Sequence, residues 1–121
     1  MTARPLSLIV EDHAPTRRAM ARLLGQIGWD VVAAGTIAEG IAALDRHPVI
    51  LILDLMLPDG DGEEILRRVR EAGLPTRIAI TTATGDSDRL DAVRRLGPVD
   101  LLPKPVSFDE VCRICDPALT A

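Results

Sequence analysis

The sequence predicts an α/β domain in which a doubly wound parallel sheet carries helices on both faces. Five short apolar runs recur along the chain, and each is nearly continuous rather than alternating, which is typical of strands buried on both faces of a parallel sheet. These runs are Leu6–Val10, Val31–Ala34, Val49–Leu53, Arg77–Thr81 and Val99–Leu102. Segments with helical spacing of apolar residues lie between them, and the connections are short. This alternation of strand and helix predicts one sheet with right-handed crossovers.

The expected helices begin and end at residues that suit those positions. Three of them begin with a Ser, Thr or Asp that is followed three residues later by Glu, which is the capping-box pattern. These patterns are Thr36-x-x-Glu39, Asp61-x-x-Glu64 and Ser107-x-x-Glu110. Pro15 fits the first turn of the first helix, because the missing N–H donor has no partner there. Gly28, Gly73 and Gly97 fall just past helix ends, where a left-handed residue is favoured.

Length and composition predict a single domain over residues 1–121, with no output domain after it. Trp29 and Phe108 are the only aromatic residues, so base-stacking platforms for nucleic acid are not expected. The formal net charge of −4 also argues against binding to a phosphate backbone. No signal peptide is recognisable, and no apolar run approaches the roughly 20 residues that span a bilayer. We therefore expect a cytoplasmic protein with neither nucleic acid nor a membrane among its partners.

Cys112 and Cys115 form one C-x-x-C pattern near the end of the chain. No second cysteine pair or nearby histidine completes a zinc site, and a redox C-x-x-C would follow an early strand instead. Because both cysteines fall on the last expected helix, we interpret them as ordinary helix residues. His13 and His47 are assigned to a surface loop and a helix end, without a ligand role.

Polar side chains follow four of the expected strands at the points where these strands end. They are Glu11 and Asp12 after the first strand, Asp54 after the third, Thr81 and Thr82 at the end of the fourth, and Lys104 after the fifth. Ligands of open parallel sheets bind outside the carboxyl ends of the strands, so these side chains are expected to meet at one edge. This convergence is the strongest functional signal in the sequence.

The residue types at this edge favour phosphoryl transfer. Three carboxylates brought together raise one another's pKa, and a bound cation relieves the repulsion. Oxygen ligands without histidine or cysteine favour Mg²⁺, which leaves room for a phosphate oxygen. Asp54 is then a candidate nucleophile, because aspartate carboxylates form acyl phosphates. Lys104 and a threonine hydroxyl supply the positioning and charge neutralisation that phosphoryl transfer requires.

Each of these residues also has a plainer interpretation. Asp12 or Asp61 alone would be a turn or cap residue, and Thr82 alone would be a strand residue. Asp59 belongs to the turn Pro58-Asp59-Gly60 and is expected to act only there.

Asp54 and Lys104 are harder to explain in that plain way. Leu55-Met56-Leu57 follows Asp54, where a capping aspartate would be followed by a turn dipeptide. Lys104 is the single lysine among fourteen basic residues, which indicates a need for a compact ammonium charge at that position.

Four short motifs from these strand ends occur in order along the chain. They are Leu8-Ile9-Val10-Glu11-Asp12, Leu53-Asp54-Leu55-Met56-Leu57-Pro58-Asp59-Gly60, Thr82-Ala83 and Lys104-Pro105. Together they resemble the receiver domain of bacterial two-component response regulators, over nearly the whole chain. The resemblance implies a flavodoxin-like fold with five strands in the order 2-1-3-4-5, and a cis peptide between Lys104 and Pro105.

The resemblance also implies an acceptor and a metal site. Asp54 would receive a phosphoryl group from a histidine kinase or a histidine phosphotransfer protein. Mg²⁺ would be held by Asp12, Asp54 and the backbone carbonyl of Met56, and by Glu11 through water.

Further residues are implied to contact the phosphoryl group or to tune its loss. Lys104 would pair with one phosphoryl oxygen, the Thr82 hydroxyl with another, and the backbone of Ala83 would also contact the group. Met56 and Thr84 would flank the path of the hydrolytic water and set the rate of dephosphorylation.

One position departs from the family pattern. Similar receivers carry an aromatic switch residue three positions before the lysine, and this chain has Leu101 there. Rotation of an aromatic ring therefore cannot be the readout. The last helix is also expected to be short, because Ser107 begins it and Pro117 ends it within about three turns.

We therefore expect a signalling module in which phosphorylation of Asp54 switches contacts with a downstream protein. The alternative is a receiver fragment or weakly switching receiver used for docking or homodimerisation, which Leu101 favours. A small phosphatase acting through an aspartyl phosphate would need a second aspartate two residues after the nucleophile, where Met56 stands. We expect no enzyme activity beyond the chain's own phosphorylation and dephosphorylation.

Overall fold

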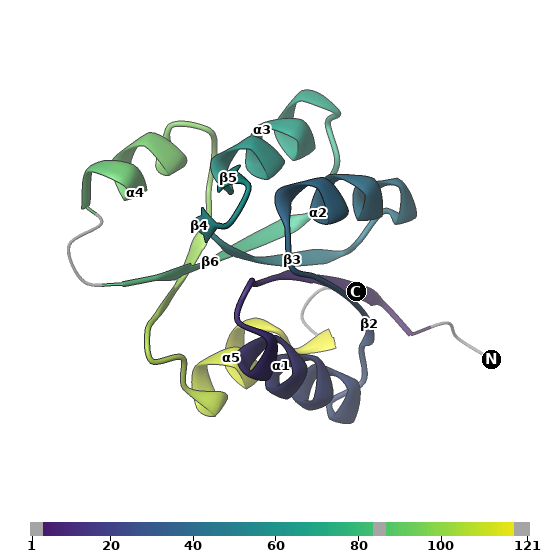
Figure 1. Ribbon diagram of the computed structural model, residues 1–121. Helices are drawn as coiled ribbons and strands as arrows, with labels where there is room; N and C mark the ends of the chain where they lie inside the picture. Colours follow the sequence, from purple (N-terminus) through teal and green to yellow (C-terminus); the bar gives the residue numbers. More distant parts are fainter. Residues whose placement is uncertain (1–3, 84–86, 118–121) are drawn as a thin grey trace.

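Five parallel strands form a central sheet in the order β2-β1-β3-β6-β7 (Figure 1). The strands are β1 (Leu6–Val10), β2 (Asp30–Ala34), β3 (Ile50–Asp54), β6 (Arg77–Thr82) and β7 (Asp100–Pro103). The computed structural model describes residues 4–83 and 87–117. The predicted strands all exist, with ends displaced by a single residue at most, and the predicted order is confirmed.

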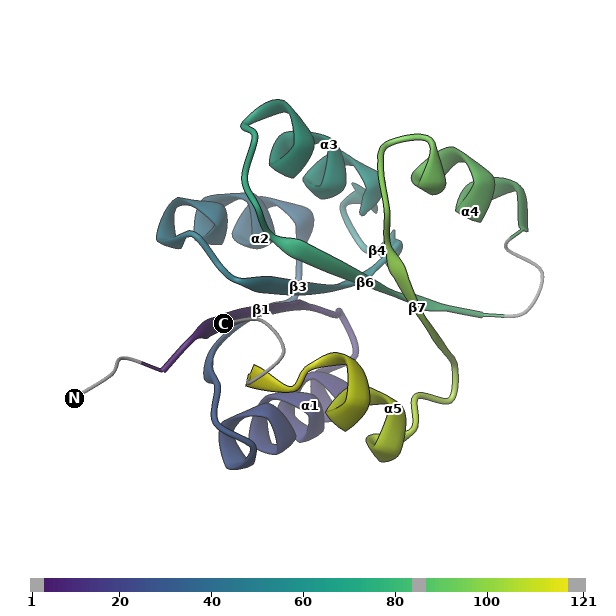
Figure 2. The same cartoon turned by 180° about the vertical axis from the view of Figure 1, so that it is seen from behind.

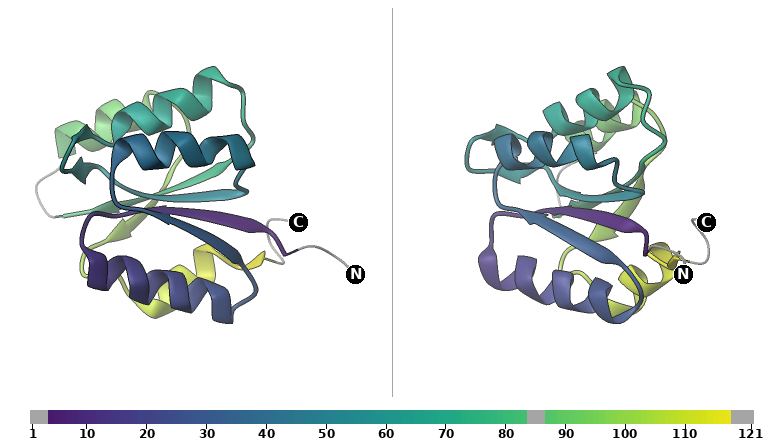
Figure 3. Two further views of the ribbon diagram at one scale, coloured as in Figure 1. Left: turned by 45° about the vertical axis from the view of Figure 1, so that its right-hand side comes forward. Right: turned by 90° about the vertical axis from the view of Figure 1, so that its right-hand side faces the viewer.

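Helices cover both faces of the sheet, as predicted. They are α1 (Ala14–Gln26), α2 (Ile37–Ala43), α3 (Glu63–Glu71), α4 (Ser87–Arg94) and α5 (Phe108–Ile114), and a 3₁₀ turn (Leu44–Arg46) follows α2. In Figures 1 and 2, α1 and α5 lie together on one face, while α2, α3 and α4 cover the other. Figure 3 shows the sheet between these two helical layers. No helix within the described ranges has the length and apolar character needed to cross a bilayer.

The core is aliphatic on both faces of the sheet. Trp29, which directly precedes β2, is the one large aromatic side chain in it, and it lies beneath α1 and α5. Its indole N–H donates a hydrogen bond to the carbonyl of Cys115 and so joins the start of β2 to the end of α5. Both cysteines are free, and burial raises the pKa of the Cys115 thiol to about 12. Cys112 lies within α5, and Cys115 is the residue that directly follows the helix.

At two of the three predicted capping boxes, the N-cap hydroxyl makes the expected hydrogen bond to the backbone. The hydroxyl of Thr36 accepts a hydrogen bond from the Glu39 N–H at 3.1 Å, and that of Ser107 accepts from Glu110 at 3.2 Å. The third prediction, at Asp61, is wrong. Asp61 pairs in a small β-ladder, and its carboxylate accepts from the N–H two residues later at 2.9 Å instead of three residues later.

That ladder is an antiparallel hairpin of β4 (Met56–Leu57) and β5 (Gly60–Asp61), inserted between β3 and α3. The predicted turn lies at its tip. Asp59 does more than form this turn, because its carboxylate accepts hydrogen bonds from Ile37 at 2.8 Å and Ala38 at 3.2 Å. The bond from Ile37 holds the pKa of Asp59 below its usual range. The hairpin is therefore tied to the first turn of α2 by a tertiary cap.

Candidate functional site

Three carboxylates meet at the carboxyl edge of the sheet. Glu11 and Asp12 follow β1, Asp54 ends β3, and these two strands are hydrogen-bonded neighbours. One oxygen from each carboxylate lies within 4.8 Å of the others. Glu11 and Asp54 are buried, with exposed fractions of 6% and 4%, while Asp12 is exposed. The predicted convergence of Glu11, Asp12 and Asp54 is therefore confirmed.

Glu11 is an acid with an unusual pKa. Burial raises its pKa to about 7; the neighbouring carboxyl groups of Asp12 and Asp54 add to the rise, while a hydrogen bond from the His13 N–H at 3.3 Å opposes it. The Glu11 carbonyl accepts a hydrogen bond from the Arg17 guanidinium at 2.8 Å. Arg17, on α1, therefore fixes the backbone that carries the acid pair.

Asp54 is held by a hydrogen bond on each of its two carboxylate oxygens. Oδ1 accepts from the Met56 N–H at 2.9 Å, and Oδ2 accepts from Nζ of Lys104 at 2.8 Å. Lys104 follows β7 and must reach across β6 to make this contact, since β6 lies between β3 and β7. The peptide between Lys104 and Pro105 is cis, as the resemblance implies.

The Lys104 ammonium is stabilised by the cluster it contacts. Its partial burial lowers the pKa, but the hydrogen bond and charge of Asp54, with the charges of Glu11 and Asp12, outweigh this and raise the pKa above its ordinary value. Lys104 therefore stays protonated throughout the neutral range, as an electrostatic partner for anionic groups at the edge.

Thr82 ends β6 at the same edge and is half-buried. Its carbonyl accepts a hydrogen bond from the Lys104 N–H at 2.7 Å, but in the described part of the chain no hydrogen bond joins its hydroxyl to Asp54. Thr81 is the register partner of Asp54, and its buried hydroxyl has no hydrogen-bond partner among the described residues. Ala83 follows β6 and is exposed, while Thr84 lies outside the described residues.

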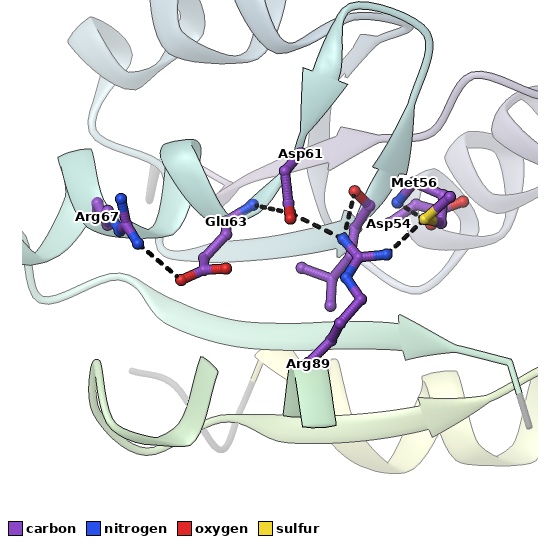
Figure 4. A network of polar contacts seen from close by, with 7 residues as sticks. Asp54, Met56, Asp61, Glu63, Arg67 and Arg89 are labelled. Atoms are coloured by element: carbon purple, nitrogen blue, oxygen red, sulfur yellow. Dashed lines mark hydrogen bonds and ion pairs between the residues drawn. The ribbon is translucent and has the colours of Figure 1, made fainter. Parts of the chain in front are cut away.

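Sequence reasoning missed two arginines that support this edge. Arg17 bonds the Glu11 carbonyl, and Arg89 on α4 bonds Asp61 and the Leu55 carbonyl behind Asp54 (Figure 4). No local pattern marks them, because both bind groups that are brought near only by the fold.

A groove of about 500 Å³ opens from the acid cluster toward α1 and α5. Glu11, Asp54 and Lys104 line its polar part, while Met20 and Phe108 belong to its apolar lining. Phe108 is 66% exposed, so an aromatic side chain on the rim faces solvent. The groove gives an incoming group access to Asp54 from solvent.

The cluster could hold a metal ion. The three carboxylates supply oxygens that lie close enough together to bind one ion. Among the described residues, Lys104 is the only basic side chain that forms an ion pair with Asp54. Hard oxygen donors of this kind suit a small divalent cation better than zinc. Burial, together with the neighbouring carboxyl groups of Asp12 and Asp54, raises the pKa of Glu11, and a bound cation would favour its charged form.

The acid cluster predicts a pH-dependent free energy of unfolding. Between the ordinary Glu11 pKa of 4.5 and its folded value of about 7, the folded protein holds a proton that the unfolded chain has lost. The contribution of this proton to the free energy of unfolding is therefore fully present below pH 4.5. It is lost as pH rises from 4.5 through the folded pKa of about 7. Urea unfolding at a series of pH values, with a chelator present, should show this decline in the wild type and a flatter profile in Glu11→Gln. The exposed Glu64→Gln is the matched control, and equal profiles for all three proteins would contradict the assignment to Glu11.

A parallel sheet with an acid cluster and one lysine at its carboxyl edge defines a receiver-type signalling domain. The family model described as "Response regulator receiver domain" matches residues 7–116, and the chain belongs to this family. The solved signal receiver domain of a putative LuxO repressor protein from Vibrio parahaemolyticus is 30% identical, with a TM-score of 0.86, over 98% of this chain and 90% of that chain. A CheY-like receiver domain protein from Methanospirillum hungatei, with 21% identity over 97% of this chain and 94% of that one, shares the fold at a TM-score of 0.89.

Longer curated proteins resemble the chain as well. The transcriptional regulatory protein TrcR of Mycobacterium tuberculosis is 40% identical over 106 residues, and CutR of Streptomyces coelicolor is 37% identical over 109 residues. Each match covers 86% of this chain but only 41% and 48% of TrcR and CutR, so the chain spans less than half the length of either relative. Because both relatives are named as transcriptional regulators, the expectation that nucleic acid is not a partner receives no support.

Proposed function

We propose that the chain is a phosphoacceptor module in which Asp54 takes a phosphoryl group from a histidine kinase or a histidine phosphotransfer protein. The observation that carries the proposal is the pairing of a buried carboxylate with a single lysine, 2.8 Å apart, inside a cluster of acids. Burying a carboxylate is costly unless it is paired, and the partners of Asp54 are the Met56 N–H and Lys104 at this same edge, which favours a chemical role over a purely structural one.

The residues of the edge divide the work of the reaction. An oxygen of Asp54 attacks phosphorus, a new P–O bond forms, and the bond to the donor breaks with its electron pair leaving on the donor. Lys104 neutralises negative charge on the transferred group, and Thr82 and the Ala83 backbone are proposed to bond its other oxygens. A bound Mg²⁺, held by Asp12, Asp54 and the Met56 carbonyl and through water by Glu11, would neutralise further charge on the phosphoryl oxygens.

Phosphorylation would then act through charge on the surface around α4, β7 and α5. The added group brings negative charge and strong acceptor oxygens to an edge that already holds three acids. We propose that residues 1–121 form one receiver domain, that this change switches contacts with a downstream protein, and that Met56 and Thr84 set the phosphoryl lifetime. A docking or dimerisation module is the second candidate, and Leu101 in place of an aromatic residue favours it.

The proposal is tested by phosphorylation with a small donor. Incubation with acetyl phosphate and Mg²⁺ should add one phosphoryl group to the intact mass of the protein, and a chelator should suppress the addition. The label should be removed by hydroxylamine, which cleaves acyl phosphates and leaves phosphoserine intact. An unlabelled protein, or a label that resists hydroxylamine, would overturn the proposal.

A further inference from the structure

Arg89 connects α4 to the segment that follows the acceptor. Nη2 of Arg89 lies 2.8 Å from Oδ1 of Asp61 and 3.1 Å from the Leu55 carbonyl oxygen, and Nη1 contacts the sulfur of Met56 (Figure 4). The guanidinium is therefore shared between β4, β5 and the residue directly after Asp54. Its side chain is 28% exposed, so solvent only partly screens these contacts.

The path from Asp54 to this guanidinium is short. Oδ1 of Asp54 accepts a hydrogen bond from the N–H of Met56, and the side chain of Met56 touches Arg89. The same oxygen of Asp61 that receives Arg89 also accepts from the Glu63 N–H at 2.9 Å, at the start of α3. Arg89 of α4 thus contacts Met56, which bonds Asp54, and Asp61, which bonds the first residue of α3.

Leu101 gives this contact a particular importance. Leu101 is half-buried and packs against the aliphatic core beneath α2, α3 and α4, where it has no polar group to exchange partners. Any link between Asp54 and α4 that depends on changing hydrogen bonds must therefore use other side chains. Arg89 is such a side chain, because its guanidinium bonds Asp61 and the Leu55 carbonyl and touches Met56, whose N–H bonds Asp54.

We propose that Arg89 is a positioning residue that couples the acceptor site to α4, an inference that rests on the proposed function of Asp54. In the unmodified protein it holds α4 on the β4–β5 hairpin. A phosphoryl group on Asp54 competes with Asp61 for the guanidinium, because planar Arg donors bind phosphoryl oxygens in pairs. The two states differ in the partners of Arg89, so phosphorylation shifts the balance between them and α4 moves.

The side chain must be arginine for this role. A lysine ammonium keeps the charge but cannot offer separate donors to the Asp61 carboxylate, the Leu55 carbonyl and the Met56 sulfur in one fixed fork. Arg89→Lys should therefore couple α4 to the site only partly, while Arg89→Met, which keeps an unbranched stem but removes the guanidinium and its charge, should not couple them. Arg95→Met, at an exposed arginine just beyond α4, is the matched control.

The test is amide exchange of the peptide covering residues 88–94, measured with and without acetyl phosphate and Mg²⁺, alongside intact mass. Without donor, Arg89→Met should exchange roughly fivefold faster than the wild type over this peptide, which corresponds to about 1 kcal/mol. With donor, the exchange rate of this peptide should change in the wild type and in Arg95→Met, and it should change less in Arg89→Lys. In Arg89→Met the exchange rate should stay the same, although the intact mass shows the phosphoryl group.

The outcomes separate this inference from the proposed function. Loss of labelling in the wild type counts against the function of Asp54, and the comparison without donor still tests whether Arg89 holds α4. Normal labelling with an α4 response in Arg89→Met equal to that of the wild type overturns the coupling and leaves the phosphoacceptor intact. A labelled wild type whose α4 exchange is unchanged also overturns it.

Discussion

Asp54→Asn is expected to abolish phosphoryl uptake from a small donor. Asparagine has nearly the same shape and can still accept a hydrogen bond from the Met56 N–H, which lies 2.9 Å from Oδ1 in the wild type. It lacks the anionic oxygen that attacks phosphorus, so the loss should be complete rather than partial. Intact mass after incubation with acetyl phosphate and Mg²⁺ measures it directly.

Asp59→Asn is the matched control for this substitution. Asp59 is also an aspartate of the segment after β3, but it lies on the hairpin tip and caps α2. The Asp59→Asn protein should therefore take up as much phosphoryl label as the wild type. Equal labelling of Asp54→Asn and the wild type would mean that another residue is the acceptor, while loss in both variants would point to damage of the hairpin.

Gly62→Ala is expected to destabilise the fold strongly at the same edge. A Cβ at this position would lie 2.6 Å from the carbonyl oxygen of Asp54 and 3.2 Å from Cα of Leu55, which are backbone atoms that cannot rotate away. The chain after the acceptor must shift to accept the methyl group, at a cost of about 2–3 kcal/mol in free energy of unfolding. Urea unfolding of the variant and the wild type measures the difference.

Gly25→Ala on α1 makes the same chemical change but is expected to raise the free energy of unfolding. Nothing lies within 4 Å of a Cβ at Gly25, and the residue is inside a helix, so the variant should gain about 0.5–1 kcal/mol. A Gly62→Ala protein as stable as the wild type would show that the backbone near Asp54 yields more easily than its packing indicates.

The strands follow from the sequence because apolar runs act locally, while their order was implied by the resemblance to receiver domains and is one of the few topologies that chain connectivity admits. The acid cluster follows for a related reason. Glu11, Asp12 and Asp54 each come directly after a buried run, and the ends of parallel strands meet at one edge whatever the details of the packing. Lys104 was expected at this edge because it follows the fifth apolar run, and its being the only lysine of the chain strengthened that expectation.

The parts that the sequence did not reveal depend on contacts between distant segments. Asp59 looked like a turn residue, but its carboxylate reaches residues of α2 that lie 22 and 21 positions earlier. Asp61 had the spacing of a capping box, but pairing in the β4–β5 hairpin moved its hydrogen bond to Glu63. Arg89 had no signal at all, since its partners are determined by where α4 rests on the sheet.

The position of Trp29 makes the protein's fluorescence a report on its global state. The sole indole lies at the start of β2, at the end of the sheet opposite to Asp54, and is enclosed by the α1–α5 core. Its emission will therefore follow denaturant-induced exposure of that core. Intrinsic emission thus gives the stability of every variant on a scale independent of the phosphorylation chemistry.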